Sequence, residues 1–324
     1  MKKLKFIDLF CGIGGFRLAL EMRGHQCLFS SDWDPHAQLV YHQNYGDCPV
    51  GDITQYPGND IPGHDLLCGG FPCQPFSISG NQKGFKDTRG TLLHEILRIA
   101  RESHPKVLLL ENVRNYLTHN GGQTMAVTLE LLKSAEYQVY FRTLNSSDFG
   151  VPQKRERLFF VCFHKDITAE KFSFPEPKKE DVALEDILLP ENDPRLEELI
   201  VRRDDLVLKN ELPTRRENRP LRIGTVGKGG QGERVYSVKG HAITLSAFGG
   251  GIGAKTGMYL VNNNVRRLHP VECQRIMGFP DNFILHEKTN VCYKQFGNSV
   301  VVPVVSALLE EIEKTLKLTP LMAA

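Results

Sequence analysis

Cys73 stands in a setting that suits chemical reaction better than packing. It lies in the stretch GGFPCQP at 69–75, directly after the apolar run 65–68. A thiol between prolines in a loop can present its sulfur to a ligand, and the thiolate would be a strong nucleophile. The alternative, a half-buried thiol that only packs, is usual for cysteines in general but fits this loop poorly. Cys73 is therefore a candidate nucleophile.

One carboxylate and two arginines could act together with that sulfur. Glu111 ends the apolar run 108–110, where a buried carboxyl could serve as a general acid or merely cap the following helix. Gln153, Arg155 and Arg157 alternate at the start of another expected strand, which places them on one face. Their guanidiniums could fix a base, a phosphate or Glu111 itself.

A glycine turn follows the first apolar run of the chain. Residues 4–10 lead into CGIGG at 11–15 and then into a helical pattern with an apolar stripe. Glycines let the backbone approach a cofactor, and a helix N-terminus favours acceptor groups. By itself, such a turn could serve NAD, FAD or S-adenosylmethionine, or could simply be a tight connection.

The second apolar run strengthens the cofactor interpretation. It ends in Ser31-Asp32-Trp33, where a carboxylate can bind ribose hydroxyls and an indole can face an adenine. The alternative is an aspartate helix cap beside a core tryptophan. Cofactor binding is favoured because the glycine turn and the acidic residue coincide as the dinucleotide fingerprint requires.

These residues need a framework that gathers strand ends. Short apolar runs alternate with helical patterns, which predicts βαβ units and a mainly parallel sheet in an α/β fold of Rossmann-like type. Ligands of such sheets lie at the carboxyl ends of the strands. The expected strands cover residues 4–10, 26–30, 65–68, 107–110, 139–144 and 158–163.

Composition sets limits on the class of protein. The chain has 324 residues, 41% of them hydrophobic, enough for one large core and a smaller second body. No apolar run is long enough to span a bilayer, and the basic start at 1–6 is not expected to be a signal peptide. The eight cysteines are scattered, which favours reduced thiols in the cytoplasm over disulfides, and their spacing predicts no metal site.

The part of the chain expected to form the second body differs in composition from the first half. Any basic surface must be confined to one region, because the net charge of the whole chain is only +2. Residues 213–240 hold seven basic residues against two acidic ones, and eleven of the 29 glycines fall within 224–257. A flexible, solvated insertion and a surface that contacts phosphates and reads bases are both compatible with this composition.

The ordered motifs together resemble the DNA (cytosine-5)-methyltransferase family. The matching segments are FxGxGG at 10–15, PCQ at 72–74, ENV at 111–113, QxRxR at 153–157, the stretch 266–280 and QFGNSV at 295–300. They span almost the whole chain in family order. In the variable region, 227–236 and 242–255 are similar to the GCGC-specific bacterial modification enzymes of that family. Asp32 stands where the family usually carries a glutamate.

The resemblance implies a reaction and a set of sites. Cys73 would add to carbon 6 of a cytosine rotated out of the duplex, Glu111 would act at nitrogen 3, and Arg157, Arg155 and Gln153 would complete the catalytic group. S-adenosylmethionine would donate the methyl group and leave as S-adenosylhomocysteine, with no metal. The implied cofactor residues are Phe10, Gly12, Ile13, Gly14, Gly15, Asp32, Trp33, Asp52, Ile53, Pro72 and Asn298. The implied DNA-binding residues are Ser79, Gln231, Arg234 and Thr244.

The resemblance also implies how the chain is divided and what it meets. We expect a catalytic and cofactor-binding domain over 1–185 and 298–324, a loop-rich, β-containing recognition domain over 186–269 and a hinge over 270–297. The partner would be duplex DNA, and the protein a monomer of the bacterial cytoplasm. It would be paired in function with a restriction endonuclease, without a required complex.

Three other functions compete with this interpretation. An RNA cytosine-5 methyltransferase would share the catalytic core, but the large glycine-rich region speaks for duplex DNA. A nucleotide-dependent oxidoreductase would use the glycine turn yet leave Cys73, Glu111 and the arginines unexplained. An inactive DNA-binding relative would be expected to lack a catalytic residue, and none is missing from the sequence.

Overall fold

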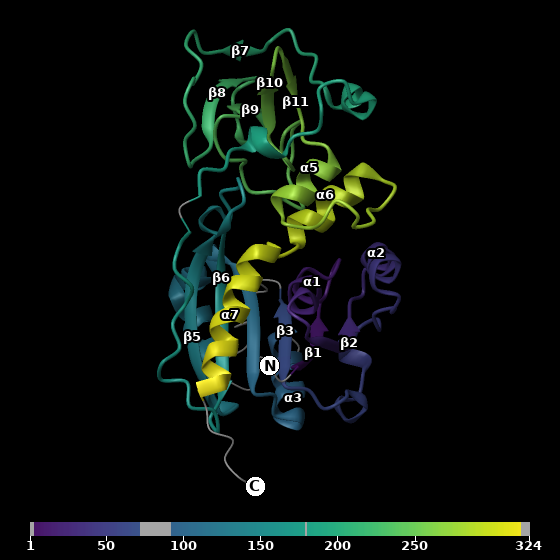
Figure 1. Cartoon of the computed structure of the whole chain (residues 1–324), viewed down its shortest axis with the longest axis vertical. Helices are drawn as coiled ribbons and strands as arrows, with labels where there is room; N and C mark the ends of the chain where they lie inside the picture. The colour runs from purple at the N-terminus through teal and green to yellow at the C-terminus, as the bar shows by residue number, and fades with distance from the viewer. Residues whose placement is uncertain (1–2, 72–91, 179, 319–324) are drawn as a thin grey trace, which may run out of the picture.

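Two β-sheets follow one another along the long axis of the molecule, with helices between them. The computed structural model describes residues 3–71, 92–178 and 180–318. The six-stranded sheet lies at one end, the five-stranded sheet at the other, and α5 (Pro270–Ile276) and α6 (Thr289–Asn298) lie between them (Figure 1). No helix in these described ranges has both the length and the apolar content needed to cross a membrane.

The six-stranded sheet confirms the predicted α/β framework. Its order is β2-β1-β3-β4-β6-β5, with parallel pairing from β2 to β4. Only β6 runs against the others, because it pairs antiparallel with both β4 and β5. The strands are β1 (Lys5–Leu9), β2 (Gln26–Ser31), β3 (Leu66–Gly70), β4 (Val107–Val113), β5 (Tyr137–Asn145) and β6 (Glu156–His164). All six expected strands are therefore present.

Strand alternation gives this sheet two apolar faces. On β1, Phe6 belongs to a buried cluster with the helices α1 (Gly15–Met22) and α7 (Val302–Leu318). Its neighbour Ile7 belongs to a second cluster with α3 (Leu92–Ser103) and α4 (Gln123–Ser134). Helices thus cover both faces, which is why the strands are nearly continuous apolar runs.

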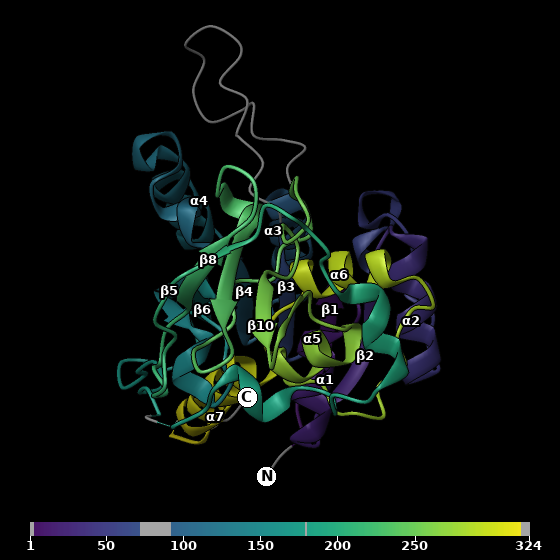
Figure 2. The same cartoon turned by 90° about the horizontal axis from the view of Figure 1, so that it is seen from above.

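The remaining helices are shorter or lie at the sides. The helix α2 (Pro35–Tyr45) begins with a cap in which the Asp34 carboxylate accepts from the His36 N–H at 2.9 Å. Seen from above, α2 and α4 lie at opposite sides of the molecule (Figure 2). The described 3₁₀ helices are Ile53–Gln55, Gly58–Asp60, Arg114–Leu117, His119–Gly122, Ser146–Phe149, Leu184–Ile187, Pro194–Leu199 and Gln231–Glu233.

The five-stranded sheet carries the glycine-rich part of the chain. Its order is β11-β10-β9-β8-β7, and only β9 and β10 are parallel. Its strands are β7 (Val207–Leu208), β8 (Leu221–Thr225), β9 (Arg234–Ser237), β10 (Met258–Val261) and β11 (Asn264–Arg266). A small apolar cluster around Ile223, Val235 and Met258 holds it together.

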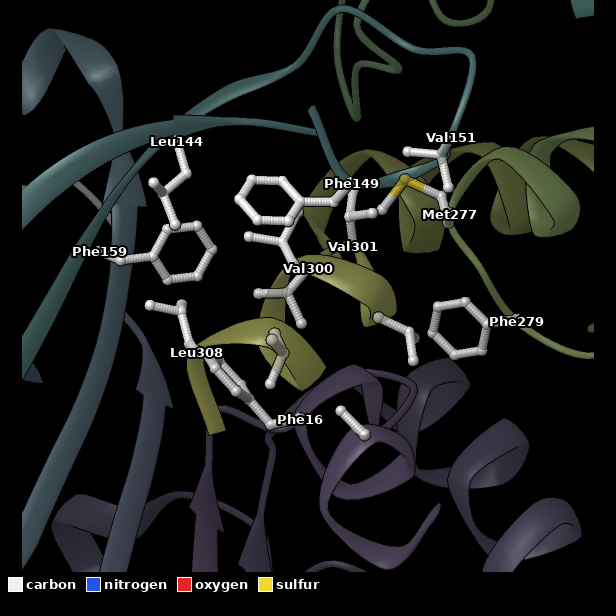
Figure 3. Close-up of a cluster of buried hydrophobic side chains, with 14 of the residues drawn as sticks. Phe16, Leu144, Phe149, Val151, Phe159, Met277, Phe279, Val300, Val301 and Leu308 are labelled. Carbon is white, nitrogen blue, oxygen red and sulfur yellow. The ribbon is translucent and has the colours of Figure 1, made fainter. Parts of the chain in front are cut away.

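The apolar cluster beside α1 and α7 continues into the second body. Tyr236, Leu245 and Tyr259 belong to the same buried cluster as Phe6. Figure 3 shows how side chains from distant segments meet there, with Phe16 of α1, Phe159 of β6, Met277, Phe279 and Val300 around one space. The two sheets are consequently joined by a shared core rather than by a linker alone.

A buried ion pair fixes the start of the helical segment between the sheets. Both guanidinium Nη atoms of Arg266 contact the Glu272 carboxylate at 2.7 Å. The same carboxylate accepts from the backbone N–H of Leu189 at 2.9 Å and of His269 at 2.8 Å. The Glu272 side chain is 0% exposed, so its charge depends on these donors.

Removing the cation from this pair should destabilise the fold strongly. Arg266→Met leaves a buried carboxylate without its guanidinium, and the free energy of unfolding should fall by about 3 to 5 kcal/mol. Urea unfolding followed by circular dichroism measures the change. Arg219→Gln is the control, because Arg219 and its partner Glu217 are 69% and 43% exposed and solvent screens their charges. Equal losses in the two variants would contradict the importance of the buried pair.

Candidate active site

The candidate residues of the first half gather at one edge of the six-stranded sheet. The glycine turn follows β1, Asp32 follows β2, Gly70 ends β3 and Glu111 lies near the end of β4. These four strands are adjacent and parallel, so their carboxyl ends share an edge. The antiparallel β6 begins at the same edge, because Arg157 is paired with Val113 of β4.

Glu111 and Arg157 form an ion pair within this edge. The Arg157 Nε lies 3.0 Å from the Glu111 Oε1, and the two side chains are 17% and 11% exposed. Burial raises the pKa of the Glu111 carboxyl, while the charges of Arg157 and Arg155 lower it. The net direction is upward because the loss of solvation outweighs the attraction of the guanidiniums. The carboxyl therefore holds a proton more readily than a glutamate in water.

The chain that leads to Cys73 starts beside this carboxyl. Gly70 is paired with Glu111, and a Cβ on Gly70 would lie 3.5 Å from the Glu111 Oε2. One residue later, the Phe71 carbonyl accepts from the Asn112 side-chain amide at 2.8 Å. The backbone is thus held against β4 two residues before Cys73. Pro72, Cys73 and Ser79 themselves lie outside the described residues.

Arg155 and Gln153 do not share the surroundings of Arg157. The strand β6 begins only at Glu156, so strict alternation does not apply to the two residues before it. Arg155 is 2% exposed and donates to the carbonyls of Leu245, Gly297 and Ser299 at 2.7 to 2.9 Å. The Gln153 side chain is fully buried. It donates to the Ile276 carbonyl at 3.2 Å and to the Met277 sulfur, and accepts from the Leu245 N–H.

The turn after β1 is held open by a carboxylate. Phe10, Gly12 and Gly14 all have positive φ, and a Cβ on Gly12 would meet nothing within 4 Å. The Gly12 N–H donates to the Asp32 Oδ2 at 2.8 Å, which ties the turn to the end of β2. Burial raises the pKa of Asp32, and backbone N–H donors lower it. Open space above a fixed glycine turn is what a bound nucleotide-like cofactor requires.

The other candidate cofactor residues differ in exposure. Trp33 is 83% exposed, so it is not the core tryptophan of the alternative interpretation. Asp52 is exposed and caps a 3₁₀ turn, whereas the Ile53 side chain is buried. Ile13, Gly14 and Gly15 are buried in the turn, and Asn298 is exposed at the end of α6. A carboxylate, an exposed indole and an open glycine turn fit a cofactor that carries an adenosine.

The candidate DNA-binding residues lie beside two glycine loops that touch. Gln231 is exposed, and its neighbour Gly232 accepts from the Gly253 N–H at 2.8 Å. Arg234 begins β9, and its Nε is buried with no hydrogen-bond partner among the described residues. Thr244 donates to the Lys154 carbonyl at 2.7 Å, which places it near the start of β6.

The structure adds residues that the sequence did not single out. Asn112 holds the segment before Cys73 through its bond to the Phe71 carbonyl. Its position next to Glu111 in the sequence could have indicated that it lies at the site. Tyr45 donates to the Gly14 carbonyl at 2.9 Å, but nothing in the sequence links positions 31 residues apart. Asp8 is buried on β1, and burial raises its pKa to about 8. Phe248 is 74% exposed beside Gly249 and Gly250.

The thiols of the sheet contrast with the setting predicted for Cys73. Cys11, Cys68 and Cys162 are buried, and the loss of solvation raises the pKa of each thiol. Such thiols stay protonated and unreactive. Among the described residues, no group of three or more histidine, cysteine or acidic side chains could hold a metal ion.

Comparison with known proteins agrees with this geometry. The family model of C-5 cytosine-specific DNA methylases matches residues 4–314. The chain is 50% identical over 317 residues to the Type II methyltransferase M.HhaI of Haemophilus parahaemolyticus, covering 98% of this chain and 96% of that protein. It is 44% identical to the Type II methyltransferase M.NgoBI of Neisseria gonorrhoeae, covering 94% of this chain and 91% of that protein.

The fold is also shared with a solved structure. The Dnmt2 methyltransferase of S. pombe is similar with a TM-score of 0.70 and 17% identity, over 97% of this chain and 99% of that one. At this identity the likeness concerns the fold alone. The family match across the chain and the 50% identical relative go further. The chain belongs to the C-5 cytosine-specific DNA methylases, and it is a DNA (cytosine-5-)-methyltransferase of the family that uses S-adenosylmethionine.

Proposed function

We propose that the shared edge of the six-stranded sheet is the methyl-transfer site, and that Cys73 is its nucleophile. One observation carries this assignment. The buried carboxyl of Glu111, paired with Arg157 at 3.0 Å, adjoins Gly70 and Phe71, from which the chain continues to Cys73. A thiol, a proton-holding carboxyl and a cofactor turn at one edge suit the activation of a cytosine ring.

The chemistry begins with a covalent bond to the base. Carbon 5 of cytosine is a weak nucleophile until the Cys73 thiolate adds to carbon 6. Glu111, hydrogen-bonded at nitrogen 3, supplies the proton that the ring takes up as this bond forms. S-adenosylmethionine, when bound, supplies the electrophilic methyl group. A base then takes the proton from carbon 5, the Cys73 thiolate leaves as the ring regains its double bond, and nitrogen 3 returns its proton to Glu111.

The two arginines and Gln153 would have different supporting roles at the site. Arg157 contacts the Glu111 carboxylate, so it can hold that group and the base oxygen in place. Arg155 and Gln153 hold backbone around the site rather than each other or Glu111. We assign them positioning roles within the catalytic group.

The cofactor would lie over the open glycine turn. Gly12 and its neighbours Phe10, Ile13, Gly14 and Gly15 would line its amino-acid end. Asp32 and Trp33, at the end of β2, would contact the ribose and the adenine. The remaining contacts would come from Asp52, Ile53, Pro72 and Asn298. S-adenosylhomocysteine would be the product.

Duplex DNA would lie between the two sheets. We place a recognition domain at 186–269, a hinge at 270–297 and the catalytic domain in the rest of the chain. Gln231, Arg234 and Thr244 would meet the duplex from the recognition side, and Ser79 from the opposite groove. The target cytosine must rotate out of the stack, at a cost of a few kcal/mol, to reach the sheet edge.

GCGC is the recognition sequence we propose. Its support is the resemblance of residues 227–236 and 242–255 to the GCGC-specific members of the family. An arginine such as Arg234 commonly reads guanine edges. We further infer a monomer that modifies DNA on its own, paired in function with a restriction endonuclease, as the Type II names of the relatives favour.

Fluorine at carbon 5 should trap the covalent intermediate. Duplex DNA with 5-fluorocytosine at the target, incubated with the protein and S-adenosylmethionine, should give an adduct that survives denaturing electrophoresis, because the base cannot remove fluorine. Cys73→Ala should abolish both adduct and turnover while binding of DNA is kept. Cys48→Ala removes an exposed thiol and should change neither. An adduct formed by Cys73→Ala would exclude Cys73 as the nucleophile.

The raised pKa of Glu111 should appear in the pH dependence of methyl transfer. The protonated carboxyl is the active form, so the single-turnover rate should fall as the pH rises through that pKa. Arg157 lowers the pKa of Glu111, so Arg157→Met should move the fall to higher pH. Glu111→Gln cannot titrate and should be slower by about 10² to 10⁴ without this fall.

The free energy of unfolding should depend on pH in the same direction as the rate of methyl transfer. Folding favours the protonated Glu111, so its contribution is full below the pKa of an unfolded glutamate and is lost as the pH rises through the raised folded-state pKa. Relative to Glu111→Gln, the wild type should therefore lose stability toward higher pH. A wild type that gained stability instead would show that Arg157 controls the pKa.

Protection of plasmid DNA tests the recognition sequence. Plasmid from cells that express the protein should resist an endonuclease that cuts GCGC, because methyl groups block its sites. Plasmid from cells with Cys73→Ala should be cut completely. Bisulfite sequencing reports the methylated context directly, and methylation outside GCGC would replace the proposed sequence while leaving the activity in place.

A further inference from the structure

The guanidinium of Arg155 joins three backbone segments that are far apart in the chain. Its Nη1 donates to the Leu245 carbonyl at 2.9 Å, and its Nη2 donates to the Gly297 carbonyl at 2.9 Å and the Ser299 carbonyl at 2.7 Å. Leu245 follows Thr244, which we propose to contact DNA. Gly297 and Ser299 flank Asn298, which we propose to contact the cofactor. One buried side chain thus holds both neighbourhoods.

Gly297 provides a second, independent contact between the same two segments. A Cβ at this position would overlap the backbone nitrogen of Ala247 and the carbonyl carbon of Ser246. The segment after Thr244 therefore lies directly on the last turn of α6, backbone against backbone. Glycine is required here by the close approach and not by its own dihedral angles, because it lies within a regular helix.

The far side of the Gly297–Val300 stretch touches the glycine turn. A Cβ on Gly15 would lie 2.8 Å from the Val300 Cγ2 and 2.9 Å from the Ser299 Oγ. Figure 3 shows Val300 in the same apolar cluster as Phe16, the residue after Gly15. The path from the DNA-facing segment to the cofactor turn is thus continuous and consists of close, buried contacts.

Buried contacts of this kind transmit displacement. A guanidinium with three short bonds to carbonyls cannot release one of them without leaving a buried acceptor unpaired. A shift of Leu245 when DNA binds therefore has to move Gly297 and Ser299 as well, or break those bonds. Because Asn298 lies between the two carbonyls, its position follows theirs.

We propose that Arg155 is a positioning residue that couples DNA binding to cofactor binding. The proposal rests on the assigned roles of Thr244 and Asn298. Coupling between two sites is reciprocal, so DNA should tighten the cofactor and the cofactor should tighten DNA by the same factor. A residue that only stabilised the fold would leave that factor unchanged.

The test measures the coupling factor directly. S-adenosylhomocysteine is titrated by calorimetry into the full-length protein, with and without a saturating duplex that carries the methylated context. In the wild type, DNA should lower the dissociation constant by about fivefold or more, within the usual range of coupled sites. In Arg155→Lys, which keeps the charge but cannot span three carbonyls, the ratio should fall to about one. The affinity for each partner alone is measured in the same titrations, so that the ratio reports coupling and not a loss at one site.

Two further variants separate coupling from general loosening. Arg266→Lys also alters a buried arginine, 3% exposed against 2% for Arg155, but its guanidinium pairs with Glu272. It should lower the melting temperature and keep the wild-type coupling factor. Gly297→Ala changes no charge and displaces the segment at Ser246 and Ala247, so it should reduce the factor as Arg155→Lys does.

The outcomes are distinct. Wild-type coupling in both Arg155→Lys and Gly297→Ala would overturn the proposal, as would an equal loss in Arg266→Lys. A wild type that binds S-adenosylhomocysteine and DNA without mutual effect would overturn the coupling while leaving the methyl-transfer assignment intact. A wild type that binds neither would overturn both. The same ratio from fluorescence anisotropy of labelled duplex, with and without S-adenosylhomocysteine, checks the reciprocity.

Discussion

The site depends on a carboxyl that is kept from water without being fully neutralised by its partner. Glu111 lies where β4 meets β3 and β6, and these strands remove it from solvent. Arg157 opposes that effect from 3.0 Å away. Burial prevails, so the pKa of Glu111 is raised. With more exposure to water, or with a closer pairing to Arg157, the pKa of this carboxyl would fall and it would hold a proton less readily.

The same strand order determines what can reach that carboxyl. Because β1, β3 and β4 are parallel neighbours, the glycine turn, the segment before Cys73 and Glu111 come to one edge. Asn112 strengthens this arrangement by holding the Phe71 carbonyl, while its neighbour Glu111 faces Arg157. Adjacent residues on β4 therefore serve two tasks, one for each side of the strand. The fold thus brings the candidate site residues on these described strands to one edge of the sheet.

Much of this could be predicted from the sequence, and the failures have physical reasons. The strands were predicted correctly because buried parallel strands are apolar runs. Glu111 was singled out because it ends one of these runs, and its catalytic role stays a prediction. The proximity of Arg157 to Glu111 was among the predicted options. Contacts such as Tyr45 with Gly14 depend on how α2 packs, which no local pattern encodes. The contacts of Gln153 and Arg155 with distant backbone segments were not predicted, because β6 starts after them, at Glu156, and strand alternation does not extend to them.

Arg155 and Arg157 show how one residue type takes two roles within three positions. Arg157 faces a carboxylate, so its charge acts on a titrating group. Arg155 faces three carbonyls, which offer dipoles in fixed directions and no net charge. For the first, the sign of the charge matters most, whereas for the second the planar fork of donors matters most. Because of this difference, the two arginines of the motif cannot be described only by the positive charge that they share. The geometry of the acceptors, set by the end of α6 and by the segment at Leu245, decides which arginine acts on a carboxylate and which joins distant segments of the chain.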